Sequence, residues 1–376
     1  MISNLKLMTI VGTRPEIIRL SEVIKLCDKY FTHLLVHTGQ NWDYKLNRIF
    51  FEELGIREPD RYLDAAAGHL GETIGNIFAR SYEALVEEKP DALLILGDTN
   101  SALSAIAAKR LKIPVFHMEA GNRCFDENVP EEINRRIVDH ISDINLPYTE
   151  HSRRYLISEG IRGDRIFVTG SPMREVLEKN YENIAKSDIL EKLGLVSRKY
   201  LVVSAHREEN IDIEDSFLSL MTAINEAADS LDMPVIYPTH PRSRKRIEER
   251  GFAFHRNVIN TEPFGFFDYI KLQQNAHCVL SDSGTLSEES AILGFAGVLI
   301  RTSTERPEAL DAGTVVIGGI KQEDMLSAIR LSTAMFNEKE PLSEVPDYKH
   351  NNVSVKVVKL IESLTKIVDR DVWGKG

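Results

Sequence analysis

Short apolar runs alternate with longer amphipathic segments along most of the chain. Each run carries four to six residues of the type found in protein interiors, and most end in a turn-forming residue. The runs are LKLMTIVG, HLLVHTG, ALLILGD, IPVFHMEAG, INLPYT and RIFVTGS in the first half, and YLVVSAH, PVIYPTH, NVINTEP, HCVLSDSG and GVLIRTSTERPE in the second. Helix-like stretches such as 15–29 and 73–88 separate them. Continuous apolar strands separated by helices predict parallel sheets covered on both faces.

The pattern restarts after a polar stretch, TGSPMREVLEKNYENIAKSDILEKLGLVSRK, which has the character of an interdomain connection. We therefore predict an α/β protein with two Rossmann-like domains, at residues 1–172 and 173–350, and a C-terminal helix within 351–376. Such sheets bind ligands beyond the carboxyl ends of their strands. Because the polar motifs of both halves follow strand ends, we expect the two domains to face each other across a cleft.

Composition excludes several classes of function. The 376-residue chain has a net charge of -11, which argues against a nucleic-acid surface, since phosphate binding needs clustered Lys and Arg. No apolar run approaches the ~18 residues of a membrane-spanning helix. The cysteines, Cys27, Cys124 and Cys278, are far apart, which argues against a disulfide framework or a zinc site. We expect a cytoplasmic protein that binds no nucleic acid, membrane or metal.

Two loops of the first half carry candidate site residues. In GTRPE, Pro15 suits the first turn of a helix, so Arg14 would project from the loop and could bind an anion; a surface arginine is the alternative. In GDTNS, Asp98 follows a very apolar strand. It is either a helix N-cap or a carboxylate whose pKa is raised by desolvation towards the range needed for proton transfer.

The second half offers an anion-binding loop and a histidine. SDSGTLSEE is a strand end, a small-residue turn and a helix start, which suits a phosphate group; capping by Ser283 or Thr285 is the alternative. SAHREEN places His206 and Arg207 after a buried strand, where the histidine is either functional or a satisfied structural residue. The sequence has no GxGxxG fingerprint and no HExxH-like spacing, so we predict no dinucleotide cofactor and no metal.

The segment HMEAGNRCFDENVPEEINRR concentrates the carboxylates Glu119, Glu131 and Glu132. The i,i+4 spacing of Glu131 to Arg135 and of Glu132 to Arg136 is typical of a solvated helix stabilised by modest ion pairs. Glu119 differs, because it follows an apolar strand directly. Residue chemistry alone therefore indicates an anion-binding, acid-rich site and does not name a reaction.

Taken in order, GTRPEIIRL, HTGQ, GDTNSAL, HMEAGNR, PEEINRR, TGSP, SAHREEN, YPTHP, SDSG and TERPEAL resemble the non-hydrolysing UDP-N-acetylglucosamine 2-epimerase family over about residues 5–330. The resemblance implies a GT-B-like pair of Rossmann domains, usually in a homodimer. It also implies inversion at C2 of a UDP-linked 2-acetamido sugar, by anti elimination of UDP to a 2-acetamidoglycal and re-addition. Two proton-exchanging groups are needed, because the C2 proton leaves from one face and returns to the other.

The resemblance also assigns roles residue by residue. The acid/base carboxylates would be Asp98, Glu119 and Glu131, and His206 would be catalytic or contact phosphate. The contacts to the nucleotide and to other site residues would come from Arg14, Arg19, Arg207, Ser283, Gly284, Thr285, Glu289 and Arg306. Among these, Arg14 and the Ser283–Gly284 amides would bind the diphosphate, and Glu289 the ribose. Arg19 stands where many members carry lysine.

The chain departs from the common family pattern at several positions. SDSGT replaces TDSGG, so Thr285 stands for a glycine, and EAGNRC replaces EAGLRT. HTGQN is followed by Trp42, otherwise a packing residue, whereas the common bacterial enzymes carry TGQH and use that region in an allosteric UDP-GlcNAc site, which argues against such control here. The segment HMEAGNRCFDENVPEE resembles the branch that converts UDP-2-acetamido-2,6-dideoxy-L-talose to UDP-N-acetyl-L-fucosamine for capsule or O-antigen assembly.

Four other functions remain open at this point. The nearest is interconversion of UDP-GlcNAc and UDP-ManNAc. A GT-B glycosyltransferase would share the diphosphate and ribose contacts but would not need Asp98, Glu119 and Glu131 together. A hydrolysing epimerase would release free N-acetylmannosamine. A non-catalytic UDP-sugar sensor would keep its function when these carboxylates are replaced.

Overall fold

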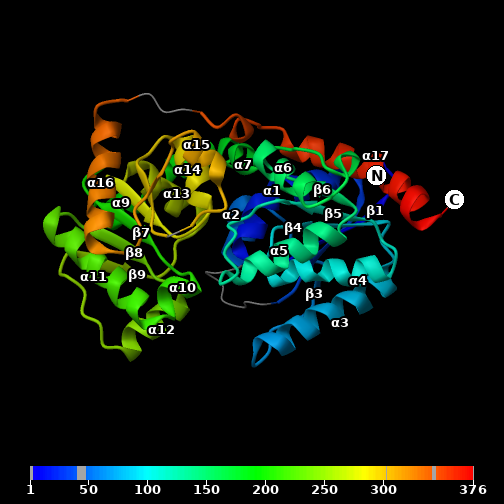
Figure 1. Cartoon of the computed structure of the whole chain (residues 1–376), viewed down its shortest axis with the longest axis horizontal. Helices are drawn as coiled ribbons and strands as arrows, with labels where there is room; N and C mark the ends of the chain where they lie inside the picture. Colours follow the sequence, from blue (N-terminus) through cyan, green and yellow to red (C-terminus); the bar gives the residue numbers. More distant parts are fainter. Residues whose placement is uncertain (1–2, 40–47, 302, 341–343, 376) are drawn as a thin grey trace. The chain divides into compact units, whose positions relative to one another are not determined.

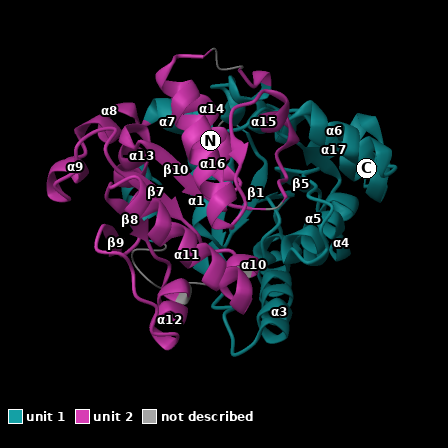
Figure 2. Ribbon diagram, turned by 60° about the vertical axis from the view of Figure 1, so that its left-hand side comes forward, with its two compact units in different colours: residues 1–179, 347–376 teal, residues 180–346 magenta. Residues whose placement is uncertain are grey.

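The computed structural model describes residues 3–39, 48–301, 303–340 and 344–375. It divides into two compact units, unit 1 with Met1–Lys179 and Asp347–Gly376, and unit 2 with Asn180–Pro346 (Figure 2). The division falls within the polar connection, at Lys179 where the sequence suggested residue 172. The C-terminal segment belongs to unit 1.

Unit 1 is built on a six-stranded parallel sheet with the order β3-β2-β1-β4-β5-β6. The strands are β1 (Lys6–Val11), β2 (Thr32–His37), β3 (Arg61–Tyr62), β4 (Ala92–Leu96), β5 (Val115–Met118) and β6 (Ile144–Leu146). This is the strand order of the Rossmann fold. Leu7 pairs with Ala92, which sets β1 beside β4 at the centre.

Helices cover both faces of this sheet (Figure 1). They are α1 (Arg14–Tyr30), α2 (Arg48–Leu54), α3 (Leu70–Glu88), η2 (Asn100–Leu103), α4 (Ser104–Arg110), α5 (Pro130–Ile141), α6 (Glu150–Ser158), η3 (Gly163–Arg165), α7 (Met173–Lys179), η4 (Pro346–Tyr348) and α17 (Val353–Trp373). Met8 and Ile10 of β1 pack against α3 and α4, because alternate strand residues face the same side. On α7, Glu175 accepts a hydrogen bond from Ser354 N at 2.9 Å, which ties α17 to this unit.

Unit 2 repeats the same architecture. Its sheet has the order β12-β11-β10-β7-β8-β9, which is again the Rossmann order when its strands are counted from β7. The strands are β7 (Leu201–Ser204), β8 (Val235–Pro238), β9 (Val258–Thr261), β10 (Cys278–Ser281), β11 (Gly297–Leu299) and β12 (Val316–Ile317). Ser281 pairs with Ser204 at the carboxyl ends of β10 and β7.

Two helical layers enclose the second sheet. The helices are α8 (Tyr181–Lys186), α9 (Ile189–Lys192), α10 (Glu208–Ile211), α11 (Glu214–Ser230), α12 (Pro241–Glu249), α13 (Phe266–Asn275), α14 (Thr285–Leu293), α15 (Pro307–Asp311) and α16 (Gln322–Asn337). Leu201 and Val203 pack towards α11 and α16. Val202, between them, packs towards α13 and α14. The predicted α/β class with two Rossmann-like units is confirmed.

One predicted strand is wrong. The run RIFVTGS forms only a single parallel bridge, between Ile166 and Asn145. Phe167 N donates to Asn145 O at 3.0 Å, and Thr169 N donates to Pro147 O at 3.0 Å. A parallel ladder would next need an N–H from residue 147, which proline lacks, so the segment runs beside β6 without becoming a strand.

Candidate functional site

The predicted site residues follow strand ends at the same topological place in each unit. The strand order reverses between β1 and β4 in unit 1 and between β7 and β10 in unit 2. Open α/β sheets bind ligands beyond the carboxyl ends of the strands at such a switch point. Arg14 and Asp98 follow β1 and β4, and His206 and Ser283 follow β7 and β10. Each unit therefore has polar side chains at its own switch point.

Glu119 directly follows β5 and is held by a buried arginine. Its carboxylate forms an ion pair with Arg19 of α1 and accepts a hydrogen bond from Asn122 Nδ2 at 3.3 Å. Its backbone is left-handed, with φ of 63°, a conformation that costs a non-glycine residue ~1–2 kcal/mol. A Cβ at Gly97 would lie 3.3 Å from Glu119 Oε2, so a side chain there would press on the carboxylate. Unit 1 thus brings the predicted residues Glu119 and Arg19 together.

Asp98 follows β4 and shares an arginine with a second carboxylate. Arg135 of α5 donates to Asp98 Oδ2 from Nε at 3.0 Å and from Nη2 at 2.6 Å. Arg135 also donates from Nη1 to Glu132 Oε2 at 2.9 Å. The Asp98 side chain keeps 22% of its surface exposed, whereas that of Glu132 is fully buried. Asp98 is therefore both fixed in orientation and open to a ligand.

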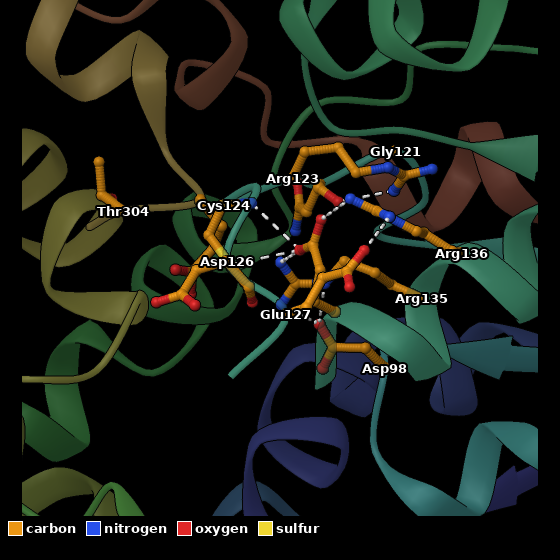
Figure 3. Close-up of polar contacts among 12 residues, drawn as sticks. Asp98, Gly121, Arg123, Cys124, Asp126, Glu127, Arg135, Arg136 and Thr304 are labelled. Atoms are coloured by element: carbon orange, nitrogen blue, oxygen red, sulfur yellow. Dashed lines mark hydrogen bonds and ion pairs between the residues drawn. The ribbon is translucent and has the colours of Figure 1, made fainter. Parts of the chain in front are cut away.

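Glu132 contacts three residues that Figure 3 labels, Cys124, Arg135 and Arg136. It accepts hydrogen bonds from Cys124 N at 3.1 Å and from the Cys124 thiol at 3.3 Å. Arg136 Nη2 donates to its other oxygen at 3.2 Å. Burial raises the pKa of the Cys124 thiol above its usual value, so this group acts as a hydrogen-bond donor. The network links Asp98 to the loop that follows Glu119.

The prediction that the charged face of α5 is solvated is wrong for Glu132 and Arg135. The expected pair between Glu132 and Arg136 is present, but Glu132 is buried, and Arg135 is buried with it. Charges taken out of water must be paired, and here one guanidinium lies between two carboxylates. Glu131 is half-buried in the first turn of α5, and its predicted catalytic role stays a prediction.

Glu16 is a buried residue of unit 1 that the sequence motif did not single out. Its carboxylate accepts hydrogen bonds from Gly12 N at 3.1 Å, Thr13 Oγ1 at 2.7 Å and Thr99 Oγ1 at 3.1 Å, and from the Ser101 hydroxyl. Burial raises its pKa to about 7, although these hydrogen bonds oppose the shift. It joins the loop after β1 to the loop after β4. An acidic residue in the first turn of a helix ordinarily indicates only a favourable interaction with the helix dipole, so nothing in the sequence marks Glu16 for this role.

Asp139 organises the loop that carries Glu119. It accepts hydrogen bonds from Gly121 N at 3.1 Å and from Arg123 Nη1 at 2.7 Å, and lies 3.0 Å from His117 Nδ1. Gly121 has φ of 82°, and a Cβ there would meet a backbone oxygen at 2.5 Å, so only glycine fits. An aspartate inside a helix carries no sequence signal for this role, which is why it was missed.

In unit 2, Asp282 holds the loop that carries His206. Its Oδ2 accepts hydrogen bonds from His206 N and Arg207 N, each at 2.9 Å, and from Asn210 Nδ2 at 3.1 Å. Asp282 Oδ1 lies 3.2 Å from His206 Nδ1. The Asp282 side chain is fully buried, and that of His206 is 38% exposed. One carboxylate therefore fixes the loop backbone and faces the imidazole.

The loop after β10 leads into α14 with small residues. Ser283 Oγ lies 3.1 Å from Thr285 Oγ1 and accepts from Thr285 N at 3.4 Å, but Gly284 is the N-cap residue and no side chain caps the helix. A Cβ at Gly284 would lie 2.5 Å from Glu305 Oε1, so this position requires glycine. Glu289 is buried on α14 and accepts from Gln273 Nε2 at 2.7 Å. The three predicted loop residues lie together at a helix N-terminus, where backbone N–H groups favour anions.

The predicted binding residues Arg207 and Arg306 contact acidic groups of unit 2. Arg207 donates from Nε to Asp282 O at 2.9 Å and from Nη2 to Glu305 Oε1 at 3.1 Å. Arg306 is buried, with Nη2 3.3 Å from Glu288 Oε1. These contacts give both arginines a structural function in holding the loops.

The remaining predictions concern Arg14, the cysteines and Trp42. Arg14 is half-buried at the start of α1, with its guanidinium 5.7 Å from the Phe50 ring centre. All three cysteines are free thiols. In the part of the chain that the structure describes, no cluster of His, Cys, Asp and Glu is suited to a metal, and no helix is long and apolar enough to cross a membrane. Trp42 and the end of its motif lie outside the described residues.

Comparison with known proteins identifies relatives along almost the whole chain. The model of a family described as UDP-N-acetylglucosamine 2-epimerase matches residues 25–362. The structure of UDP-N-acetylglucosamine 2-epimerase from Rickettsia bellii is similar with a TM-score of 0.91 and 47% identity, covering 99% of this chain and 100% of that one.

Two further relatives differ in the sugar that they are named for. UDP-GlcNAc 2-epimerase of Methanocaldococcus jannaschii, solved in complex with UDP-GlcNAc and UDP, has a TM-score of 0.90 and 32% identity, with coverage of 96% of this chain and 100% of that one. The UDP-2,3-diacetamido-2,3-dideoxy-D-glucuronate 2-epimerase of Pseudomonas aeruginosa is 35% identical over 334 residues, 87% of this chain and 92% of the relative. Similar identity thus accompanies different sugars.

Proposed function

This chain belongs to the UDP-N-acetylglucosamine 2-epimerase family and is an isomerase acting at C2 of a UDP-linked sugar; we propose that its substrate is UDP-2-acetamido-2,6-dideoxy-L-talose. The product would be UDP-N-acetyl-L-fucosamine, a precursor for surface polysaccharide. One observation carries this choice of sugar. Asn122 and Cys124, which depart from the common family pattern, contact the buried carboxylates Glu119 and Glu132.

The reaction that we propose proceeds by elimination and re-addition. A carboxylate removes the C2 proton, the C2–H electron pair forms the C1–C2 double bond, and the C1–O bond breaks, so that UDP leaves with its electron pair. UDP then adds back to C1 while a proton returns to C2 from the opposite face. Asp98, Glu119 and Glu131 are the proposed acid/base groups. Fixing Asp98 through Arg135 and Glu119 through Arg19 supports these roles, because proton transfer requires an oriented group.

Unit 2 would hold the leaving group. We assign the diphosphate to the Ser283–Gly284 amides and Thr285, and the ribose to Glu289, and Arg14 keeps its predicted role as an anion-binding residue. Backbone N–H groups at a helix N-terminus stabilise the charge that develops on the leaving oxygen. The proposed role of His206 is to contact this diphosphate or to transfer a proton to it. Arg207 and Arg306 would then support the loops through Glu305 and Glu288.

The second candidate is interconversion of UDP-GlcNAc and UDP-ManNAc. The names of the R. bellii and M. jannaschii relatives favour it. The two substrates differ in the configuration of the sugar ring, L-talo against D-gluco, and at C6, which is a methyl group in the dideoxy talose and part of a hydroxymethyl group in GlcNAc.

Proton NMR in D₂O tests both candidates. The enzyme is incubated in parallel with UDP-2-acetamido-2,6-dideoxy-L-talose and with UDP-GlcNAc, at equal concentration and without an acceptor. We expect deuterium at C2 and a new anomeric signal, with the talose derivative reacting faster. Faster turnover of UDP-GlcNAc would replace the first candidate by the second. Absence of exchange with both sugars, even with added UDP, would remove the roles proposed for all the carboxylates.

We also propose that the chain forms a homodimer through unit 1. Phe78, Tyr82 and Val86 expose a row of apolar side chains on α3, and Ile133 and Ile137 do so on α5. Helix α4 contacts both α3 and α5, so the two rows belong to one helical layer. Light scattering should give a dimer mass that falls to the monomer mass in Tyr82→Glu. The control is a substitution of an exposed tyrosine in unit 2, Tyr181→Glu, which should leave the mass unchanged.

A further inference from the structure

Asp282 and His206 form a facing pair at the switch point of unit 2. We propose that Asp282 is a positioning residue that fixes the tautomer of His206, with the proton on Nδ1 and the lone pair on Nε2. This inference rests on the proposed function only for the chemical use of Nε2. The tautomer itself is a property of the chain without substrate.

The pair owes its position to the register of two neighbouring strands. Ser281 of β10 pairs with Ser204 of β7, and Asp282 N donates to Ser204 O at 3.1 Å. Asp282 therefore leaves the end of β10 directly beside the segment that leads to His206. Because both strands are central in the sheet, the Asp282 side chain is fully buried.

The two oxygens of Asp282 have different tasks. Oδ2 accepts three hydrogen bonds, from His206 N, Arg207 N and Asn210 Nδ2. These contacts fix the carboxylate and the loop before α10. Oδ1 is buried and forms no hydrogen bond within the described chain, yet it lies 3.2 Å from His206 Nδ1. The loop function is therefore complete without Oδ1.

The absence of a hydrogen-bond donor to Asp282 Oδ1 among the described residues selects the tautomer of His206. A neutral imidazole carries one N–H, on Nδ1 or on Nε2. A buried carboxylate oxygen without a donor is unfavourable, and two lone pairs facing each other at 3.2 Å would repel. A proton on Nδ1 removes both penalties after a small rotation of the ring. Catalytic hydrogen bonds are commonly misaligned before substrate binds.

The tautomer of His206 decides whether Nε2 of its half-exposed ring can accept a proton. With Nδ1–H directed at Asp282, Nε2 carries the lone pair and can accept a proton. When Nε2 is protonated, the imidazolium is stabilised by the adjacent carboxylate and can donate to a phosphate oxygen. A ring with the opposite tautomer could not accept a proton at Nε2.

Asp282→Asn separates the two tasks. The amide oxygen can replace Oδ2 and keep the backbone contacts, whereas the amide NH₂ then replaces Oδ1 and donates towards Nδ1. The tautomer should change while the loop stays in place. Asn210→Ala is the matched control, because it removes one donor from Oδ2 and does not touch Oδ1.

The measurement is a long-range ¹H–¹⁵N correlation spectrum of the histidine rings, with the His206 signals assigned by His206→Gln. We expect Nδ1–H in the wild type and in Asn210→Ala, and Nε2–H in Asp282→Asn. An Nε2–H tautomer in the wild type would overturn the proposal even if Asp282→Asn did not fold. The same tautomer in wild type and Asp282→Asn would overturn it as well.

Kinetics separates this inference from the proposed function. We expect Asp282→Asn to lower kcat for C2 exchange about 10²-fold, with KM nearly unchanged, as expected for loss of a general acid or base. Added to His206→Gln, it should cause little further loss, and an additive loss would show that Asp282 acts through the loop instead. A changed tautomer with unchanged exchange would confirm the positioning and overturn the role proposed for His206.

Discussion

In the loops at the switch point of unit 1, acidic side chains form ion pairs with arginines. In the corresponding loops of unit 2, the acidic side chains are buried and backbone N–H groups are left as donors. In unit 1, Arg135 binds Asp98, which keeps part of its surface exposed. In unit 2, Asp282 is fully buried and accepts hydrogen bonds from backbone N–H groups, and Ser283 and Gly284 lie directly before α14. The strand order is the same in both units.

This difference shows that chemistry is decided by the loops and not by the sheet. An oriented, partly exposed carboxylate can exchange a proton with a ligand. A carboxylate held by N–H groups serves as a scaffold instead, and the donors around it can bind an anion. The comparison therefore predicts that changes to the partly exposed acids of unit 1 affect the chemical step, and that changes to the N–H donors of the loop after β10 affect nucleotide binding.

The largest effect is expected for Asp98→Asn. Asparagine can still accept from Arg135, so the fold is kept, but it cannot take up a proton. We expect kcat for C2 exchange to fall by about 10²–10⁴-fold with UDP affinity nearly unchanged. Exchange is followed by NMR in D₂O and affinity by calorimetry. Glu127→Gln, at an exposed position before α5, is the control. A variant that keeps the wild-type exchange rate would remove Asp98 from the acid/base set.

A smaller effect is expected for Gly284→Ala in unit 2. The new Cβ would lie 2.5 Å from Glu305 Oε1. Glu305 cannot move away freely, because Arg301 holds it at 2.6 Å and Arg207 at 3.1 Å. We expect the loop to shift and UDP affinity, measured by calorimetry, to fall by roughly tenfold, about 1.4 kcal/mol.

Gly75→Ala in unit 1 is the matched control for this prediction. Nothing lies within 4 Å of a Cβ at Gly75, which is inside α3. Equal UDP affinity in Gly284→Ala and Gly75→Ala would show that the loop after β10 does not bind the nucleotide.

The sequence predicted those parts of the site that depend on strand ends. Asp98, Glu119 and His206 follow apolar runs that are long enough to be buried strands, so their place at the sheet edge could be inferred. Glu16 and Asp139 could not be found in this way, because their partners come from distant segments and nothing in their own segment marks them. The strand expected at RIFVTGS failed for a similar reason, since Pro147 of the neighbouring segment stops the ladder.

Glu16 is the exception to the pattern of unit 1, and its predicted effect is on stability and not on activity. Its described hydrogen bonds come from hydroxyl groups and one amide and not from an arginine, and burial raises its pKa from 4.5 to about 7. In the unfolded chain the carboxyl ionises near its ordinary pKa, whereas in the folded chain it stays protonated until pH rises through about 7. Its contribution to stability is therefore fully present below the unfolded pKa and is lost as pH rises through the folded pKa.

Glu16→Gln removes this pH dependence while it keeps a neutral, hydrogen-bonding side chain. Between pH 5 and pH 8 the wild type should lose up to about 3 kcal/mol relative to the variant. The thermal midpoint, measured at both pH values, should therefore fall more in the wild type than in Glu16→Gln. Glu87→Gln, at an exposed position on α3, controls for the loss of one surface carboxylate. If wild type and Glu16→Gln change in parallel, Glu16 is ionised at neutral pH, and unit 1 then stabilises a buried carboxylate with hydroxyl groups and one backbone amide.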